Sequence, residues 1–320
     1  MNPEQSRADQ PAWKTWGPYI TDRQWGTVRE DYSSNGDAWE YLSHDAARSK
    51  AFRWGEEGIA GICDEAQQLC FAISLWNKKD PILKERYFGL TGNQGNHGED
   101  VKELYYYLEN TPSHSYMKML YKYPQQAFPY EELLKENNRR TKADPEYELI
   151  DTGIFDDNAY FDVFVEYAKA DTTDILIKIT VVNQGSSTAS LHVLPTIWFR
   201  NTWSWGYDEE KPQLMSSNDG EIIILHKKLG NYTLRVDQKT QVLFCENETN
   251  NQKLYNAPNS SKYCKDGIHE YLVNGNEAAV NINAQGTKAA LNYELEIPAG
   301  GNASIRLRLT ENNNADNAFS

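Results

Sequence analysis

The fold of this chain is decided by residues 160–182, which read YFDVFVEYAKADTTDILIKITVV. Two runs in this stretch carry apolar residues at every second position, as a strand with one buried face requires. The positions on the two apolar faces are Phe161, Val163, Val165, Tyr167, Ile175, Ile177, Ile179 and Val181. Residues 168–173 form a connection of hairpin length between the runs. The stretch therefore predicts two antiparallel strands.

The same pattern continues on both sides of this hairpin. Further strands are expected at residues 68–76, 101–108, 189–199, 221–226, 232–236, 291–297 and 303–309, with turns at 183–187 and 298–302. Pro129 and the acids that follow it predict a helix over residues 130–137, because proline and acidic residues are favoured in a first helical turn. The pattern indicates a mainly β fold, a large antiparallel β-sandwich of the super-sandwich type with long loops and a few short helices.

Three segments follow from the distribution of polar and apolar residues. Residues 1–12 are polar and are expected to form a disordered N-terminal tail. Residues 13–310 are expected to form the β-sandwich domain, and the Asn-rich residues 311–320 a linker. No internal repeat is visible in the sequence.

The composition excludes several classes of function. The formal net charge of -14 disfavours nucleic acid and anionic membranes, which both need a basic surface. The N-terminus lacks a charged-then-apolar signal pattern, and no stretch approaches the roughly 20 apolar residues that span a bilayer, so a cytoplasmic protein is expected. The six histidines form no HxxxH pair and the four cysteines no CxxC pair, so neither a metal nor a cofactor is expected, and the cysteines are expected to be reduced and packed.

The chain is rich in aromatic residues, with nine Trp and twenty Tyr, and residues 16–33 concentrate them in the block WGPYITDRQWGTVREDYS. Flat apolar rings beside planar hydrogen-bonding groups are what a sugar-binding surface needs. A structural loop whose charges pair with one another is the alternative. Two glycine-rich segments, residues 53–61 and 89–100, predict tight turns and close backbone approach.

These three segments supply the candidate residues for substrate binding or a domain interface. They are Tyr19, Arg23, Gln24, Trp25, Arg29, Glu30, Asp31, Arg53, Trp54, Glu56, His97, Glu99 and Asp100. Glycoside hydrolysis needs two carboxylates that face each other across a pocket, roughly 5 to 9.5 Å apart. The adjacent pairs 30–31 and 56–57 cannot supply this alone, because neighbours in a strand point to opposite faces. No catalytic residue is therefore assigned.

Seven ordered runs carry a family resemblance. They are WGPY (16–19), RQWGTVREDYS (23–33), ARSKAFRWGE (47–56), GNHGEDVKE (95–103), TPSHSYMK (111–118), YFDVFVEYAK (160–169) and LPTIWFRNTW (194–203). Together they resemble the N-terminal part of bacterial proteins related to glycoside hydrolase family 63, the mannosyl-oligosaccharide glucosidase group. The resemblance covers the chain from Trp16 to its C-terminus.

The resemblance implies a specific role for the chain. Proteins of that family join an N-terminal β-sandwich to a C-terminal (α/α)6 barrel, and their general acid and base for inverting hydrolysis of an α-glucosidic bond lie in the barrel. The chain is then a fragment: the non-catalytic half, inactive alone, whose partners are the barrel and an oligosaccharide or small glucoside. An autonomous carbohydrate-binding module is the alternative, and a complete enzyme that uses acids of the first half is a third hypothesis.

Overall fold

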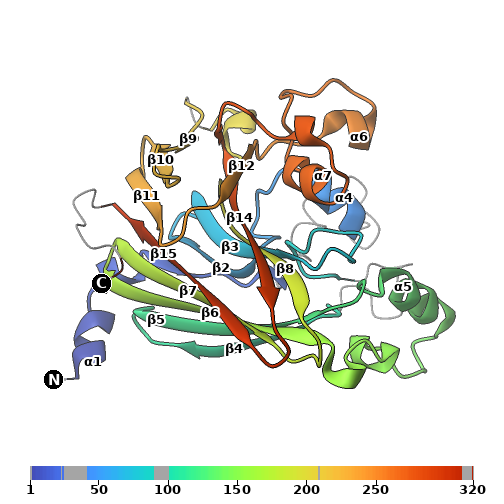
Figure 1. The fold of residues 1–320 in the computed structure, drawn as a ribbon. Helices are drawn as coiled ribbons and strands as arrows, with labels where there is room; N and C mark the ends of the chain where they lie inside the picture. The colour runs from blue at the N-terminus through green and yellow to red at the C-terminus, as the bar shows by residue number, and fades with distance from the viewer. Residues whose placement is uncertain are drawn as a thin grey trace.

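The computed structural model describes residues 2–22, 24, 42–89, 101–207, 210–311 and 319. Its strands form two antiparallel sheets (Figure 1). The nine-stranded sheet has the order β13-β9-β10-β11-β15-β7-β6-β5-β4, and the six-stranded sheet the order β1-β2-β3-β8-β14-β12. The expected mainly β fold with two large sheets and a few short helices is confirmed.

The strand bounds are as follows. The nine-stranded sheet contains β4 (Leu104–Asn110), β5 (Tyr116–Pro124), β6 (Tyr160–Asp171), β7 (Asp174–Asn183), β9 (Gln213–Ser216), β10 (Ile222–His226), β11 (Gly230–Val236), β13 (Gln285–Gly286) and β15 (Asn302–Thr310). The six-stranded sheet contains β1 (Trp16–Pro18), β2 (Ile59–Asp64), β3 (Leu69–Trp76), β8 (Ala189–Phe199), β12 (Gln241–Cys245) and β14 (Lys288–Ile297).

The hairpin predicted from residues 160–182 lies at the centre of the fold. Strands β6 and β7 pair in register, with Val163 opposite Val181 and Val165 opposite Ile179, and only Thr172 and Thr173 separate the two strands. All eight apolar positions named for this stretch are buried in the core between the two sheets. The alternation in the sequence therefore identified the inward face of both strands correctly.

The last two strands belong to different sheets. Strand β14 pairs with β8 and β12, whereas β15 pairs with β7 and β11. The turn that follows Ile297 thus carries the chain from one layer of the sandwich to the other. This connection explains why both strands alternate strictly: each presents one face to the shared core.

Helices are short and lie outside the two sheets (Figure 1). The α-helices are α1 (Pro3–Ala8), α4 (His44–Ser49), α5 (Tyr130–Arg139), α6 (Asn251–Tyr255) and α7 (Gly267–Leu272). The short 3-10 helices are η1 (Pro11–Lys14), η3 (Leu149–Thr152), η4 (Asp156–Asn158), η5 (Trp203–Trp205) and η6 (Glu277–Ala279). Helix α5 begins directly after Pro129, as predicted.

The N-terminal tail differs from the expectation of disorder for residues 1–12. Asn2 caps α1, and the Glu4 carboxylate accepts hydrogen bonds from the Ser113 amide at 2.9 Å and the Ser115 hydroxyl at 2.8 Å. A polar segment can be held by hydrogen bonds to a neighbouring turn without burying an apolar side chain, which composition alone does not reveal. The four cysteines are free thiols, and all except Cys63 are buried.

The outer face of the six-stranded sheet positions the site described next. Leu69, Phe71 and Ile73 of β3 face the core, so the alternate side chains of β3, β8 and β14 point away from it. The segments around residues 42–58, 77–88 and 246–272 cover this outer face. These segments, and not the nine-stranded sheet, bury this outer face.

Candidate functional site

A tight turn at residues 53–58 presents two of the predicted site residues. The Glu56 carboxylate accepts hydrogen bonds from the backbone amides of Arg53 at 3.2 Å and Trp54 at 2.8 Å. Gly55 has φ +84°, a conformation that favours glycine. The Glu56 carboxylate therefore closes the turn through the backbone amides of Arg53 and Trp54. The side chains of these two residues remain available for other contacts.

These two side chains meet aromatic residues of a distant loop. The Trp54 and Trp205 ring centroids lie 5.4 Å apart, and those of Trp205 and Tyr207 lie 5.7 Å apart. The Arg53 guanidinium stacks 4.0 Å from the Trp205 ring centroid and donates a 2.6 Å hydrogen bond to Ser204 Oγ. We call Arg53, Trp54, Trp205 and Tyr207 the aromatic platform. Tyr207 is 74% exposed and Trp205 36%, so ring surface remains open to solvent.

Buried acids support the loop that carries Trp205. Trp203 donates its indole N–H to Glu248 at 3.2 Å, and Lys211 bridges Glu246 at 3.1 Å and Glu248 at 2.5 Å. Burial acts to raise the pKa of Glu248, but hydrogen bonds from Lys211 and Ser260 outweigh it and the pKa is lowered. Glu248 is therefore held as an anion that braces the loop.

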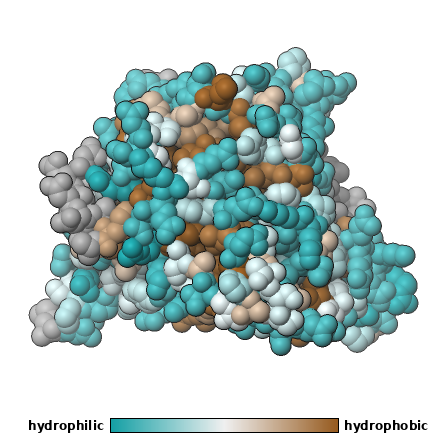
Figure 2. All heavy atoms as spheres, viewed as in Figure 1, coloured by the Kyte–Doolittle hydropathy of each residue, from teal (hydrophilic) through white to brown (hydrophobic). Residues whose placement is uncertain are grey.

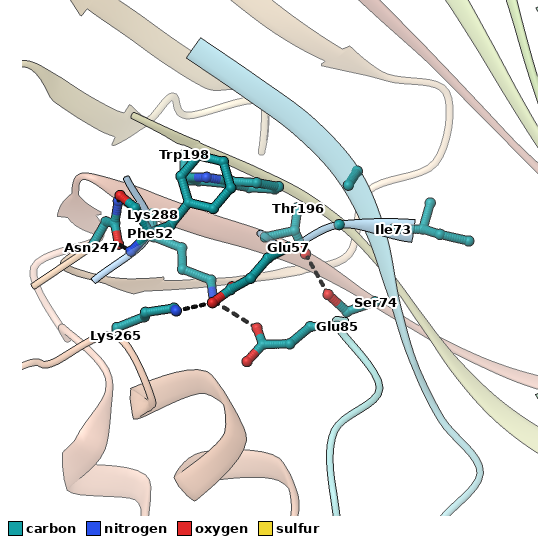
Figure 3. Close-up of a pocket in the computed structure, with 12 residues that line it drawn as sticks. Phe52, Glu57, Ile73, Ser74, Glu85, Thr196, Trp198, Asn247, Lys265 and Lys288 are labelled. Carbon is teal, nitrogen blue, oxygen red and sulfur yellow. Dashed lines mark hydrogen bonds and ion pairs between the residues drawn. The ribbon is translucent and has the colours of Figure 1, made fainter. Parts of the chain in front are cut away.

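A network of five buried charges lies under the 53–58 turn, and Figure 3 draws all of them except Arg86. Glu85 pairs with Arg86 and with Lys288, each at 2.7 Å, while Glu57 pairs with Lys265 and with Arg86. Burial acts to raise the pKa of Glu85, but the charges of Lys288 and Arg86 outweigh it and lower the pKa to about 2. These side chains are at most 6% exposed.

The cavity inside this network is too small for a sugar. Glu57, Glu85, Lys265 and Lys288 line it together with Phe52 and Trp198, and its volume is about 10 Å³. A space of that size holds at most one water molecule. The network therefore stabilises the loops over the sheet and does not bind substrate.

Five of the predicted site residues surround the same turn, but they do different things. Tyr19 donates its hydroxyl to the Glu57 carbonyl at 2.6 Å and is packed against Gly58 and Gly61, so it anchors the turn. Gln24 packs against Gly55. Glu56 is occupied by the turn amides, and only Arg53 and Trp54 contribute to the aromatic platform.

The other eight predicted residues lie outside the described residues. They are Arg23, Trp25, Arg29, Glu30, Asp31, His97, Glu99 and Asp100. The candidate list in turn omitted Trp205, Tyr207 and Lys211. The sequence WSWGY at residues 203–207 carried the same polar-aromatic signal as the block 16–33 and could have identified two of them.

The described residues contain no group of three or more His, Cys, Asp or Glu side chains that could hold a metal ion. None of their helices is both long and apolar enough to cross a membrane.

Comparison with known proteins finds one curated relative at high identity. The chain is 43% identical over 343 aligned residues to the "Uncharacterized protein YMR196W" of Saccharomyces cerevisiae, an alignment that covers 96% of this chain and 32% of the yeast protein. The chain thus spans about a third of the length of this relative. No protein-family profile matches the chain.

Two solved structures show a distant likeness to the chain. An Escherichia coli K12 protein named "Putative aldose 1-epimerase" aligns with a TM-score of 0.32 and 5% identity, over 83% of this chain and 81% of that one. A "Putative kojibiose phosphorylase from human microbiome" aligns with a TM-score of 0.29 and 8% identity, over 97% of this chain and 31% of that one. At these TM-scores neither structure transfers a function to this chain.

Proposed function

We propose that this chain is the non-catalytic β-sandwich domain of an α-glucosidase-like glycoside hydrolase, in which it packs on an (α/α)6 catalytic barrel and shapes the substrate pocket. The observation that carries the proposal is the aromatic platform, because exposed rings beside an arginine suit a sugar surface. The described acids around it are engaged in bracing: Glu56 by turn amides, and Glu57 and Glu248 by lysines. None of these three is placed to act as an acid–base pair across a pocket.

A second surface supports packing on another domain. An apolar groove of about 230 Å³ runs between the edges of the two sheets, where Ile20 from the block 16–33 meets Ile62 of β2, Tyr107 of β4 and Met119 of β5. Ile20 is 46% exposed and Tyr107 49%. Exposed apolar surface of this kind marks an interface, since single domains otherwise scatter such residues.

The face in Figure 2 is mainly hydrophilic, with apolar residues in small separate patches.

The length of the yeast relative is consistent with this role, since two-thirds of that protein lies outside the aligned region. The test is the coding sequence beyond codon 320. We expect a helical-barrel region in frame or in an adjacent gene, and expect the barrel to co-purify with this chain but not with its Ile20→Asp variant. A gene that lacks such a region, with none adjacent, contradicts the proposal.

An autonomous carbohydrate-binding module is the second candidate, and the exposed rings of Trp205 and Tyr207 favour it. Both candidate functions predict contact with sugar. The hydrolase domain requires a catalytic barrel as its partner, whereas the autonomous binding module does not. Titration calorimetry with gluco-oligosaccharides distinguishes them when combined with the gene sequence. Binding at micromolar Kd by a chain whose gene encodes no barrel would establish the module.

A further inference from the structure

A wide groove begins where the aromatic platform ends. It has a volume of about 900 Å³ and lies between the segment that enters β9 and the β10–β11 hairpin. The lining side chains that matter here are Tyr207, Lys211, Gln213, His226 and Asn231. Tyr207 belongs to both features, since its ring also contacts Trp205. Platform and groove are therefore one continuous surface, within the size range of about 300–1,000 Å³ that is usual for ligand sites.

The hydrogen-bonding groups of the groove are held in place. The His226 ring stacks on the buried Phe199 with centroids 5.5 Å apart. Its Nδ1 accepts hydrogen bonds from the backbone amides of Lys228 at 3.2 Å and Leu229 at 3.0 Å. Because Nδ1 is an acceptor, the proton of the neutral ring is on Nε2, which makes Nε2 a donor. Gln213 is positioned by a 3.1 Å hydrogen bond to Gln285.

The charges of the groove largely cancel. Lys227 pairs with Glu210 at 3.3 Å, and Lys211 is held between Glu246 and Glu248. The described lining also includes Lys228, so three lysines stand against the carboxylates of Glu210, Glu246 and Glu248, and these described charges balance. A polyanion would meet too little positive charge here, whereas a neutral polyhydroxyl ligand would find donors, acceptors and flat rings.

We propose that the aromatic platform and this groove form one extended site for a neutral oligosaccharide. Sugar rings stack on Trp205 and Tyr207, and hydroxyls of the following units hydrogen-bond to Gln213, His226 and Asn231. The site rests on the proposed function only for its choice of gluco-oligosaccharides as the ligand class. It assigns to this chain a binding surface of its own, and so extends the proposed role in packing on a barrel.

Saturation-transfer NMR on the purified chain tests this site with maltopentaose and cellopentaose as probes. We expect transfer to the sugar protons of at least one probe, with Kd in the millimolar range or tighter. Tyr207→Ala and Trp205→Ala should each weaken that binding about 10-fold or more, because each removes a flat apolar ring face on which a sugar ring would stack. Tyr207 is 74% exposed, so its truncation leaves the fold intact, which circular dichroism checks.

The matched control is Tyr106→Ala, which removes an exposed tyrosine of the edge strand β4 (44% exposed). It should leave binding within 2-fold of the parent chain. Three results would overturn the site: no transfer to either probe at 10 mM sugar, binding that both platform variants retain, or equal loss in the control. Binding of a heparin fragment in place of the neutral probes would also overturn it. These results would remove the platform as support for the proposed function, but packing on a barrel is decided separately by the gene sequence and the co-purification experiment.

Discussion

Replacement of Glu85 by Gln should destabilise the chain strongly and change its response to acid. The Glu85 carboxylate makes 2.7 Å ion pairs with both Arg86 and Lys288, and its side chain is only 5% exposed. Glutamine preserves the shape but removes the negative charge. The positive charges of Arg86 and Lys288 would then remain buried with less negative charge beside them. Removing only one partner of a buried ion pair in this way lowers stability strongly.

The magnitude follows from the lowered pKa. A fall from 4.5 to about 2 is roughly 2.5 pKa units, and at 1.36 kcal/mol per unit it corresponds to about 3 kcal/mol of folding stability. Because the folded pKa is depressed, this stability is fully present above pH 4.5 and is lost as the pH falls toward 2. The cost expected for breaking a buried pair, about 3–5 kcal/mol, agrees with it.

Urea unfolding at pH 7 and at intervals down to pH 3 measures both effects. We expect Glu85→Gln to lose about 3 kcal/mol at pH 7, and its difference from the parent chain to shrink as the pH falls below 4.5. The matched control is Glu294→Gln, which breaks an exposed pair with Lys78 and should change stability by less than about 1 kcal/mol.

A second variant separates loss of charge from loss of packing. Glu85→Gln combined with Lys288→Met removes both charges of one pair and should recover part of the stability, because an apolar partner needs no counter-ion. If Glu85→Gln stays within about 1 kcal/mol of the parent chain at pH 7 and keeps the same acid dependence, the Glu85 carboxylate does not stabilise the fold through its ion pairs.

Three further substitutions probe the turn under the aromatic platform. Gly61→Ala should lower the free energy of unfolding in urea by about 1–3 kcal/mol, because the new Cβ would lie 2.4 Å from Tyr19 Cζ. This loss of stability should be smaller in a Tyr19→Ala background, and an equal loss there would contradict the clash. Asn247→Ala should lower stability by about 2–4 kcal/mol, since it removes hydrogen bonds to the buried backbone of Phe52; a thermal midpoint within 2 °C of the parent would refute this. Glu56→Ala should cost about 1–2 kcal/mol and weaken oligosaccharide binding through the loosened turn, whereas unchanged binding would show that the turn does not set the platform.

Strands β6 and β7 were predictable because each alternates between buried and more exposed residues, whereas β5, which has the same alternation, was not among the expected strands. Val163 and Ile179 sit at alternating positions whose period decides which side faces the core, and the structure follows that period. The assignment of β14 and β15 to different sheets was not predictable, since both strands show the same alternation and only tertiary pairing separates them.

The candidate site was predictable only in part. Arg53 and Trp54 were identified from local composition, but their partner Trp205 lies about 150 residues later, and a contact at that separation leaves no local pattern. Glu56 was a candidate for substrate binding or a domain interface, and its carboxylate accepts hydrogen bonds from the turn amides; a carboxylate three residues after an amide can close a turn as readily as bind a ligand. Nor does the buried network around Glu85 have a sequence signature, since Glu57, Lys265 and Lys288 come from segments far from it in the chain, Lys288 from strand β14.

Under the proposed function, this chain contacts sugar without cleaving it. Hydrolysis of p-nitrophenyl α-D-glucoside by the purified chain between pH 4 and pH 8 tests this directly. We expect no release of p-nitrophenol above the uncatalysed rate at any pH. Turnover that persists through purification and is abolished by Glu56→Gln or Glu57→Gln would contradict it, because those carboxylates would then be catalytic and not structural.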